Sequence, residues 1–286
     1  MTMDGSDARA TNAYWGRDGL ERRILDALAA AGTNVDTLTI DDLAPADQFH
    51  SGGKSATERL ARLARLGDGM RVLDVGGGLG GPARTLATRF GCRVTVLDLT
   101  ESYVRAGLTL TARLGLADRV THRIGDALAL DVGGETFDVV WTQNSGMNIP
   151  DKERLYAGFA RVLRPGGLLA LQEPMAGPVQ PVLFPVMWAR DAGASFLRAP
   201  DEMRKVIEAA GFQVRAWDDV TAEVIGPSTG AASPAHSIQR IVMGDAVDAI
   251  ARSGQKNREE GRIVMIQAVL ERREIPAWAR APRTSG

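Results

Sequence analysis

The chain has 286 residues, of which 44% are hydrophobic and 24% charged, and its formal net charge is −1. This composition is typical of a globular protein with a large core, and the near-zero charge argues against nucleic acid or an anionic membrane as a partner. The single cysteine, Cys92, excludes an internal disulfide and a multi-cysteine metal site, and without a run of 18 apolar residues or a secretory N-terminus we expect a cytoplasmic protein.

Residues 1–69 have mostly helical patterns, for example over 19–32, and are predicted to form an N-terminal helical cap or lid. Within this segment Gly52–Ser55 resembles the end of a phosphate loop, but Gln48 stands where that motif requires glycine. We therefore reject a phosphate loop. Ser55 and Glu58 instead predict a capping box that opens a helix over 56–66.

From residue 70 onward, short apolar runs alternate with amphipathic segments. Strands are expected at 70–76, 92–99, 120–125, 137–144, 167–174, 212–220 and 262–273. Helices are expected to start at Pro150, stopping at Pro165, and at Pro200, stopping at Gly211. This pattern predicts one α/β domain over 70–286, a mostly parallel sheet with helices on both faces. Insertions near 175–199 and 223–260 are expected to cover the substrate.

The first strand runs into a glycine-rich turn that presents backbone N–H groups to a ligand. Gly76, Gly78 and Gly81 fit the dinucleotide pattern G-x-G-x-x-G, whereas Gly76, Gly78 and Gly80 fit the shorter G-x-G-x-G. Asp74 lies two residues before the first glycine, where a fixed carboxylate would repel a pyrophosphate. The same carboxylate would hold an ammonium group, so Asp74 argues against NAD.

Two further acids follow neighbouring strands. Asp98 can accept both hydroxyls of a ribose, and Asp126 can accept from an adenine amino group. A ligand with an ammonium group, a diol and a purine, but no phosphate, is S-adenosylmethionine.

Five motifs in order carry a family resemblance: DVGGGLGG, VLDLT, GDAL, FDVVWTQN and LRPGG. Together they resemble class I S-adenosylmethionine-dependent methyltransferases of the small-molecule type, such as the phosphoethanolamine, sarcosine/dimethylglycine and ubiquinone/menaquinone enzymes. The resemblance covers about residues 45–220. It implies a Rossmann-like seven-stranded sheet of order 3-2-1-4-5-7-6 with the last strand antiparallel, and S-adenosylhomocysteine as product. The cofactor-binding residues predicted from the turn, the acids and the resemblance are Gln48, Ser51, Asp74, Gly76, Gly78, Gly80, Asp98, Leu99, Asp126, Ala127 and Gln143.

The sequence predicts catalytic residues less clearly, because methyl transfer from a sulfonium mainly requires that the nucleophile be aligned with the methyl group and that water be excluded. The resemblance places an acid and a histidine in the loop after the fourth strand, but Asn144 and Asn148 stand there, and neither can take a proton. Asn148 is alternatively an N-cap. Glu173 and His50 are the predicted catalytic bases, although each has a purely structural alternative. The predicted substrate-binding residues are Asn144, Met147, Asn148, Met175 and Trp188.

The sequence therefore predicts an enzyme that methylates O, N or C of a small, largely apolar molecule. The alternatives are an NAD-linked oxidoreductase and a non-catalytic protein that binds S-adenosylmethionine. No metal is expected. Bulky residues expected to be exposed, Trp15 and Trp278, leave a homodimer open.

Overall fold

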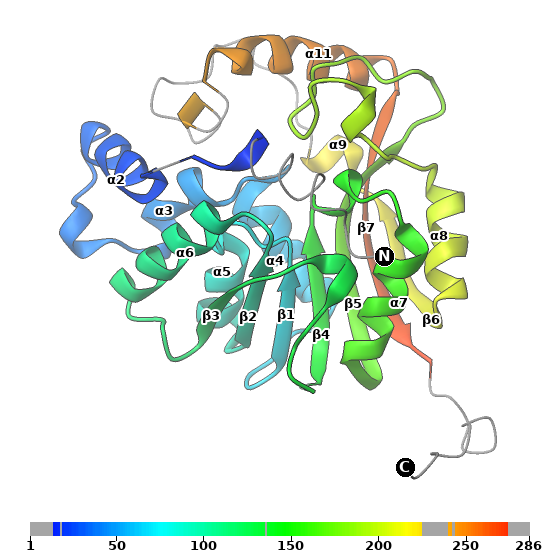
Figure 1. Ribbon diagram of the computed structural model, residues 1–286, viewed down its shortest axis with the longest axis horizontal. Coiled ribbons are helices and arrows are strands. Elements are labelled where there is room, and N and C mark those ends of the chain that lie inside the picture. The colour runs from blue at the N-terminus through cyan, green and yellow to red at the C-terminus, as the bar shows by residue number, and fades with distance from the viewer. Residues whose placement is uncertain (1–13, 18, 135, 225–239, 242–243, 274–286) are drawn as a thin grey trace.

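The computed structural model describes residues 14–17, 19–134, 136–224, 240–241 and 244–273. Seven strands form one sheet of order β3-β2-β1-β4-β5-β7-β6 (Figure 1), which confirms the predicted topology. β7 is antiparallel to both neighbours, β5 and β6, whereas the other strand pairs are parallel. The strands are β1 (Arg71–Val75), β2 (Arg93–Asp98), β3 (Val120–Ile124), β4 (Phe137–Gln143), β5 (Leu163–Ala176), β6 (Phe212–Asp219) and β7 (Ile263–Arg272).

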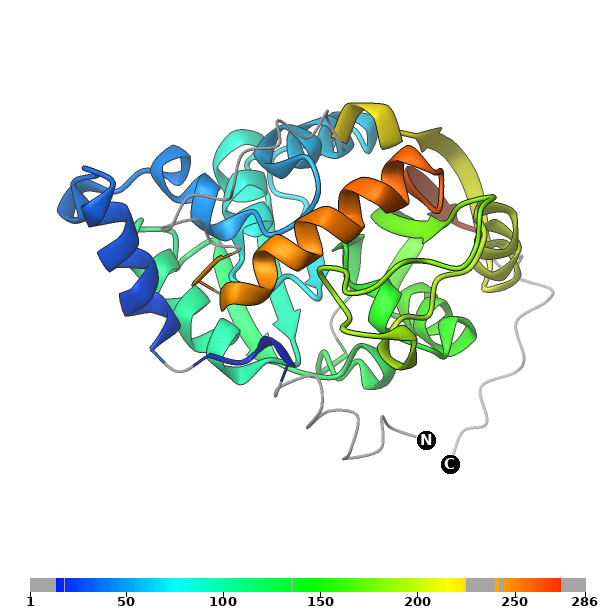
Figure 2. The ribbon, with the colours of Figure 1, turned by 90° about the horizontal axis from the view of Figure 1, so that it is seen from above.

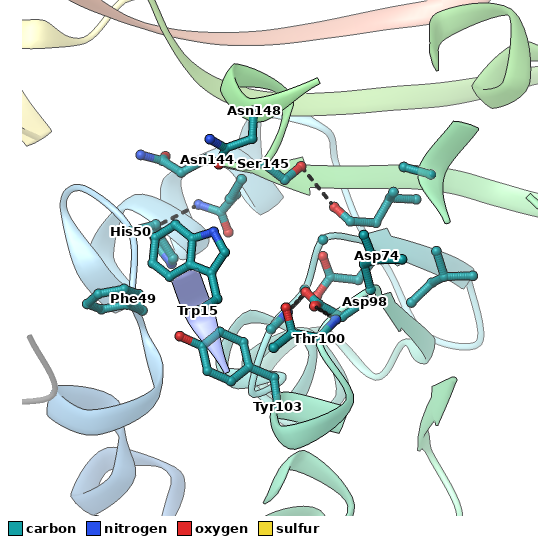
Figure 3. Close-up of a pocket in the computed structure, with 18 of the residues that line it drawn as sticks. Trp15, Phe49, His50, Asp74, Asp98, Thr100, Tyr103, Asn144, Ser145 and Asn148 are labelled. Carbon is teal, nitrogen blue, oxygen red and sulfur yellow. Dashed lines mark hydrogen bonds between the residues drawn. The ribbon is translucent and has the colours of Figure 1, made fainter. Parts of the chain in front are cut away.

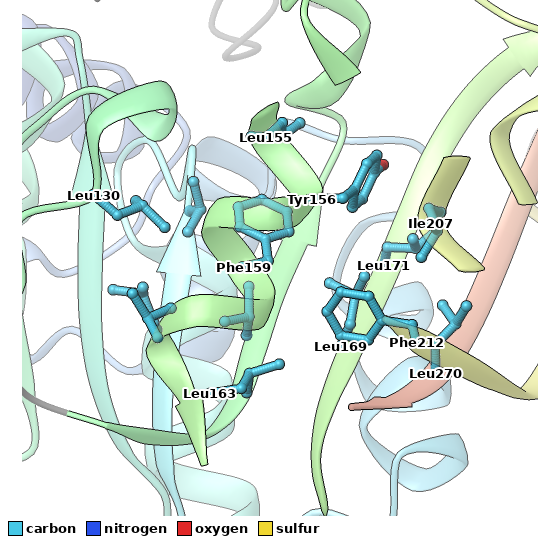
Figure 4. Packing of buried hydrophobic residues seen from close by; sticks show 14 of the residues in the cluster. Leu130, Leu155, Tyr156, Phe159, Leu163, Leu169, Leu171, Ile207, Phe212 and Leu270 are labelled. Atoms are coloured by element: carbon cyan, nitrogen blue, oxygen red, sulfur yellow. The ribbon is translucent and has the colours of Figure 1, made fainter. Parts of the chain in front are cut away.

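Successive side chains of each strand point to opposite faces of the sheet, and apolar side chains occupy both faces. Helices therefore cover both faces. On one face Leu73 and Leu171 belong to an apolar cluster with residues of α7 and α8. Figure 4 shows Leu171 in this cluster with Tyr156 of α7 and Ile207 of α8. On the other face Val72 and Trp141 pack against α4 and α5. The helices are α2 (Leu20–Ala30), α3 (Ile40–Asp47), α4 (Gly53–Leu63), α5 (Gly81–Phe90), α6 (Glu101–Arg113), α7 (Lys152–Val162), α8 (Pro200–Ala209), α9 (Thr221–Val224) and α11 (Val247–Glu259).

Three elements close the end of the molecule above the strands. α2 and α3 pack on α6 through a shared apolar cluster. α11 crosses above the sheet, between those helices and the segment after β5 (Figure 2). Its Ile250 joins the α2–α6 cluster, while Asn257 exchanges two hydrogen bonds with the backbone of Leu183, each 2.8 Å long. The segment 226–237, which lacks helical or strand periodicity within the predicted 223–260 insertion, lies outside the described residues.

The element boundaries differ from the predictions at three points. α4 begins at Gly53, after Gly52 with φ 78°, so the predicted capping box at Ser55 is wrong. α7 begins after Asp151, whose side chain accepts from Arg154 N at 2.9 Å. β5 begins at Leu163 rather than at residue 167, because Leu163 already pairs with Phe137 across a register shift.

Candidate active site

A cavity of about 360 Å³ opens at the carboxyl ends of β1, β2 and β4 (Figure 3). Parallel sheets bind ligands at this edge, where the strand order reverses on either side of the first strand. The predicted site residues that line the cavity are His50, Ser51, Asp74, Gly76, Gly78, Asp98, Leu99, Asp126, Ala127, Gln143, Asn144, Met147, Asn148 and Trp188. Four predicted residues do not line it: Gln48, Gly80, Glu173 and Met175.

The glycine-rich turn brings the backbone close to the loop after β4. Gly76 has φ 71°, and a Cβ atom there would lie 2.3 Å from the Cβ of Ser145. A larger residue at position 76 would therefore push the two loops apart. Gly80 also has positive φ, 78°, and serves as the N-cap of α5, so its part is to shape the turn behind the cavity wall.

Two buried carboxylates face the cavity from β1 and β2. Asp98 accepts from Gly78 N and from Thr100 N, both at 2.8 Å. Asp74 is 1% exposed, and its Oδ2 atom has no hydrogen-bond partner among the described residues. Burial and the neighbouring Asp98 raise the pKa of Asp74 to about 8. A buried, unsatisfied carboxylate is costly, and an ammonium group of a ligand would satisfy this one.

Asp126 follows β3, as predicted, and also has a local role. Its Oδ1 atom accepts from Leu128 N at 2.8 Å, which caps the short 3₁₀ helix Ala127–Ala129. The carboxylate thus holds the turn that forms the third acidic corner of the cavity.

His50 is enclosed by polar side chains from three elements. Its Nε2 atom lies 2.9 Å from Gln48 Oε1 and 3.1 Å from Thr57 Oγ1, and its Nδ1 atom lies 3.2 Å from Ser51 O. Burial lowers the pKa of His50 to about 4, so the ring is neutral at pH 7. A neutral ring donates through one nitrogen and accepts through the other. Either Nδ1–H donates to Ser51 O while Nε2 accepts from Thr57 Oγ1, or Nε2–H donates to Gln48 Oε1 while Nδ1 accepts from Gln143 Nε2 at 3.4 Å. In both arrangements the protein engages both ring nitrogens. Gln48 does not line the cavity itself, but it contacts the ring of His50, which does.

The loop after β4 carries two asparagines with different surroundings. Asn144 has φ 53°, a left-handed conformation that asparagine tolerates better than most residues. Asn148 donates through Nδ2 to Trp188 O at 2.9 Å and to Ala194 O at 2.8 Å. The N-cap of α7 is Asp151, so the alternative interpretation of Asn148 as an N-cap is wrong. Asn148 instead ties the β4 loop to the segment after β5.

Known proteins resemble this chain in both sequence and fold. A family model described as a methyltransferase domain matches residues 72–167. The methyltransferase GfsG of Streptomyces halstedii is 30% identical over 213 residues, which cover 73% of this chain and 74% of that protein. The chain belongs to the class I S-adenosylmethionine-dependent methyltransferases. Several other curated relatives are matched over less than two thirds of their own length.

Two solved structures show how widely this methyltransferase fold is shared. Geranyl diphosphate C-methyltransferase from Streptomyces coelicolor A3(2), solved with Mg²⁺, geranyl diphosphate and S-adenosyl-L-homocysteine, has a TM-score of 0.66 at 17% identity. That alignment covers 95% of this chain and 100% of that one. The [4+2]-cyclase SpnF has a TM-score of 0.65 at 19% identity, over 93% and 97% of the two chains. At these identities the likeness shows the fold alone.

Glu173 lies behind the β4 loop of the methyltransferase rather than at the cavity surface. Its Oε1 atom accepts from Gly146 N at 3.0 Å, Thr142 Oγ1 at 3.1 Å and Ser145 N at 3.3 Å. Glu173 is 3% exposed, and burial raises the pKa of its carboxyl group. Met175 lies beside it, also away from the main cavity. The three hydrogen bonds of Glu173 hold in place the loop after β4, which carries cavity-lining side chains.

Sequence reasoning missed most of the aromatic wall of the methyltransferase. Trp15, Phe49 and Tyr103 line the cavity, and Trp15 meets Phe49 edge-on at 5.8 Å between ring centroids (Figure 3). Trp15 was expected to be exposed, and that expectation is wrong. Phe49 could have been found from its place between Gln48 and His50, but no local pattern marks Trp15. Trp278 lies outside the described residues.

None of the described helices of the methyltransferase is long and apolar enough to cross a membrane. Among the described residues, no group of three or more His, Cys, Asp and Glu side chains could hold a metal ion.

Proposed function

We propose that this enzyme transfers a methyl group from S-adenosylmethionine to a small, largely apolar acceptor. The composition of the cavity wall is the observation that supports an apolar methyl acceptor. Its non-polar part combines aromatic and thioether side chains with aliphatic ones, and no described lysine or arginine lines it. A phosphate or polycarboxylate would find no cation there, whereas apolar and aromatic molecules gain from burial against such a wall. The residues in question are Trp15, Phe49, Met147, Met187 and Trp188.

In this proposal each of the three carboxylates binds a different part of the cofactor. Asp74 Oδ2 would pair with the ammonium group, Asp98 would accept from the ribose hydroxyls, and Asp126 would accept from the adenine amino group. When bound, S-adenosylmethionine supplies a methyl group already activated on a sulfonium. The remaining work of the chain is to hold the acceptor in line with that group and keep water out.

The structure supports a mechanism without a strong general base. His50 has both ring nitrogens engaged within the protein, and Glu173 is outside the cavity wall. Neither side chain presents a free basic atom to an acceptor. We propose that the nucleophile either carries no proton or loses it to bulk water before it binds, and that Glu173 is a structural support.

One alternative has a specific observation in its favour. A cyclase is among the structures that share this fold, so the fold does not by itself require methyl transfer. A protein that binds S-adenosylmethionine without transferring its methyl group is therefore the second candidate. The NAD-linked alternative is not proposed, because Asp74 is buried where a pyrophosphate would lie.

The test is isothermal titration with S-adenosylmethionine, S-adenosylhomocysteine and NAD, followed by a screen of small apolar compounds for a mass increase of one methylene. Micromolar binding of the adenosyl compounds alone, with a methylated product, supports the proposal. Binding without any product in the screen supports the second candidate. Asp98→Ala should weaken cofactor binding, whereas Asp118→Ala, at an exposed aspartate in the turn before β3, is the matched control.

A further inference from the structure

Three amide side chains stand in a row that the proposed chemistry does not use. Gln267 on β7 lies directly opposite Gln172 on β5, and Asn144 follows Gln143, which pairs with Gln172 from β4. Gln172 and Gln267 are both fully buried in the centre of the sheet. Asn144 is the only member of the row that lines the cavity. The row therefore connects the interior of the sheet with the active site.

The orientation of Gln267 is fixed by partners that have only one hydrogen-bonding role. Its Nε2 atom donates to the backbone carbonyl of Ala56 at 2.9 Å, and a carbonyl can only accept. Its Oε1 atom accepts from Arg59 Nη1 at 2.5 Å, and a guanidinium can only donate. Its second Nε2 hydrogen then points to Gln172 Oε1, at 2.7 Å.

The orientation of Gln172 follows in the same way. Its Oε1 atom accepts from Gln267, and its Nε2 atom donates to the backbone carbonyl of Ser51 at 2.9 Å. The remaining Nε2 hydrogen is directed at Asn144 Oδ1, at 3.2 Å. The backbone of Asn144 is held too, because its N–H donates to Gln172 O at 2.8 Å.

The consequence at Asn144 is a defined polarity. The bond from Gln172 turns Oδ1 toward Gln172, so the amide atom directed away from Gln172 is Nδ2, which can only donate. Figure 3 shows Asn144 on the His50 side of the cavity, across from Asp98 and Thr100. Asn144 thus lies away from Asp98, which we assign to the ribose, and on the side of the cavity that remains for the methyl acceptor.

We propose that Gln172 and Gln267 are positioning residues that hold Asn144 Nδ2 as a fixed hydrogen-bond donor to an oxygen atom of the methyl acceptor. This inference rests on the proposed function and narrows its substrate class to apolar molecules that carry a phenol or carbonyl oxygen. A donor at that oxygen stabilises negative charge on a phenolate or enolate. A phenol, or a 1,3-dicarbonyl of similar acidity, loses its proton to bulk water before it binds. The bound anion is then nucleophilic without a general base in the cavity, in agreement with the engagement of His50.

The test uses two probes of one shape on the protein loaded with S-adenosylhomocysteine. Acetophenone has a carbonyl oxygen that can only accept, and α-methylstyrene has a methylene group in its place. Their dissociation constants are measured by NMR titration, and the ratio of the two affinities reports the donor. Affinity for S-adenosylhomocysteine is measured in parallel on every variant.

The variants separate the donor from its supports. Asn144→Asp keeps the acceptor for Gln172 but removes the donor, and should lower the preference for acetophenone about tenfold. Gln172→Met and Gln267→Met should each lower it about threefold, since Asn144 can then rotate, although neither residue touches the cavity. Gln213→Met, the same change at an exposed position on β6, should leave it unchanged.

The outcomes distinguish this inference from the proposed function. An unchanged preference in Asn144→Asp overturns the inference, and so does failure of both probes to bind the loaded protein. If Asn144→Asp lowers the preference for acetophenone but Gln267→Met does not change it, the positioning role of Gln267 is refuted. Failure to bind S-adenosylhomocysteine at all would instead overturn the proposed function.

Discussion

If Asp74 pairs with the ammonium group of the cofactor, as we propose, cofactor binding should strengthen as the pH rises toward 8. Burial, reinforced by the neighbouring Asp98, raises the pKa of Asp74 from 3.8 to about 8, so its carboxyl group is mostly protonated at neutral pH in the free protein. An ammonium group binds the ionised form, and binding must therefore expel the proton. Asp74→Asn removes this proton and the charge together.

The magnitude follows from the printed pKa. Below about pH 8 the ionised fraction of Asp74 falls tenfold for each pH unit. We expect the affinity for S-adenosylhomocysteine to rise about tenfold from pH 6 to pH 7, and about one proton to be released per molecule bound. The range stays below pH 7.5 so that the amino group of the ligand keeps its charge.

The same shift acts on folding with the opposite sign. The folded protein holds this proton between about pH 4 and pH 8 and the unfolded chain does not, so raising the pH in that window destabilises the free protein. The cost is about 1.4 kcal/mol per pH unit. Asp74→Asn should therefore bind the cofactor weakly and yet be more stable than the wild type at pH 8.

The assay is calorimetric titration in two buffers of different ionisation enthalpy, with thermal unfolding at pH 5 and pH 8. An affinity that does not change between pH 6 and pH 7, with no proton released, would refute the assignment of Asp74 to the ammonium group.

Three further substitutions test the site and its supports. Arg84→Met leaves Asp47 buried without its 2.8 Å ion pair and should cost about 3–5 kcal/mol in urea unfolding, whereas Arg89→Met breaks an exposed pair and should cost less than about 1 kcal/mol. Glu173→Gln keeps an acceptor oxygen for the β4 loop, so kcat should stay within about twofold and its pH profile unchanged; a tenfold loss with a shifted profile would show that Glu173 is a base. Trp188→Ala should raise the acceptor KM about tenfold at unchanged cofactor affinity; an equal loss of S-adenosylhomocysteine binding would contradict its assignment to the acceptor.

The fold could be predicted from the sequence because its signals are local. The apolar runs that became β1 and β2 end in Asp74 and Asp98 beside turns that glycine permits, and a parallel sheet brings such strand ends to one edge. Errors arose where distant residues decide. β5 starts early because Leu163 pairs with Phe137, a partner that no local pattern reveals.

The cavity-lining residues at the strand ends, which we propose bind the cofactor, could be predicted from sequence for the same reason. Most of the aromatic wall, which we propose binds the acceptor, could not, since it is assembled from segments far apart in the chain. Trp15 lines the cavity edge-on to Phe49, and the neighbouring Tyr14 is tied to the segment after β5 by a 3.0 Å hydrogen bond from its hydroxyl to Met187 O. Glu173 was predicted as a base from its place at a strand end, but which side of the loop its carboxylate occupies depends on Gly146 and Ser145.

The buried Arg84–Asp47 pair has a consequence for engineering this enzyme. Asp47 ends α3 of the N-terminal segment, while Arg84 lies on the helix that follows the glycine turn, and Arg84 also donates to Thr111 on α6 at 2.9 Å. Exchanging the N-terminal helices with those of a relative, to change the acceptor, would strand a guanidinium in the core unless the donor brings a carboxylate to the same place. Chimeras that import the aromatic wall must therefore import its buried counter-charge with it.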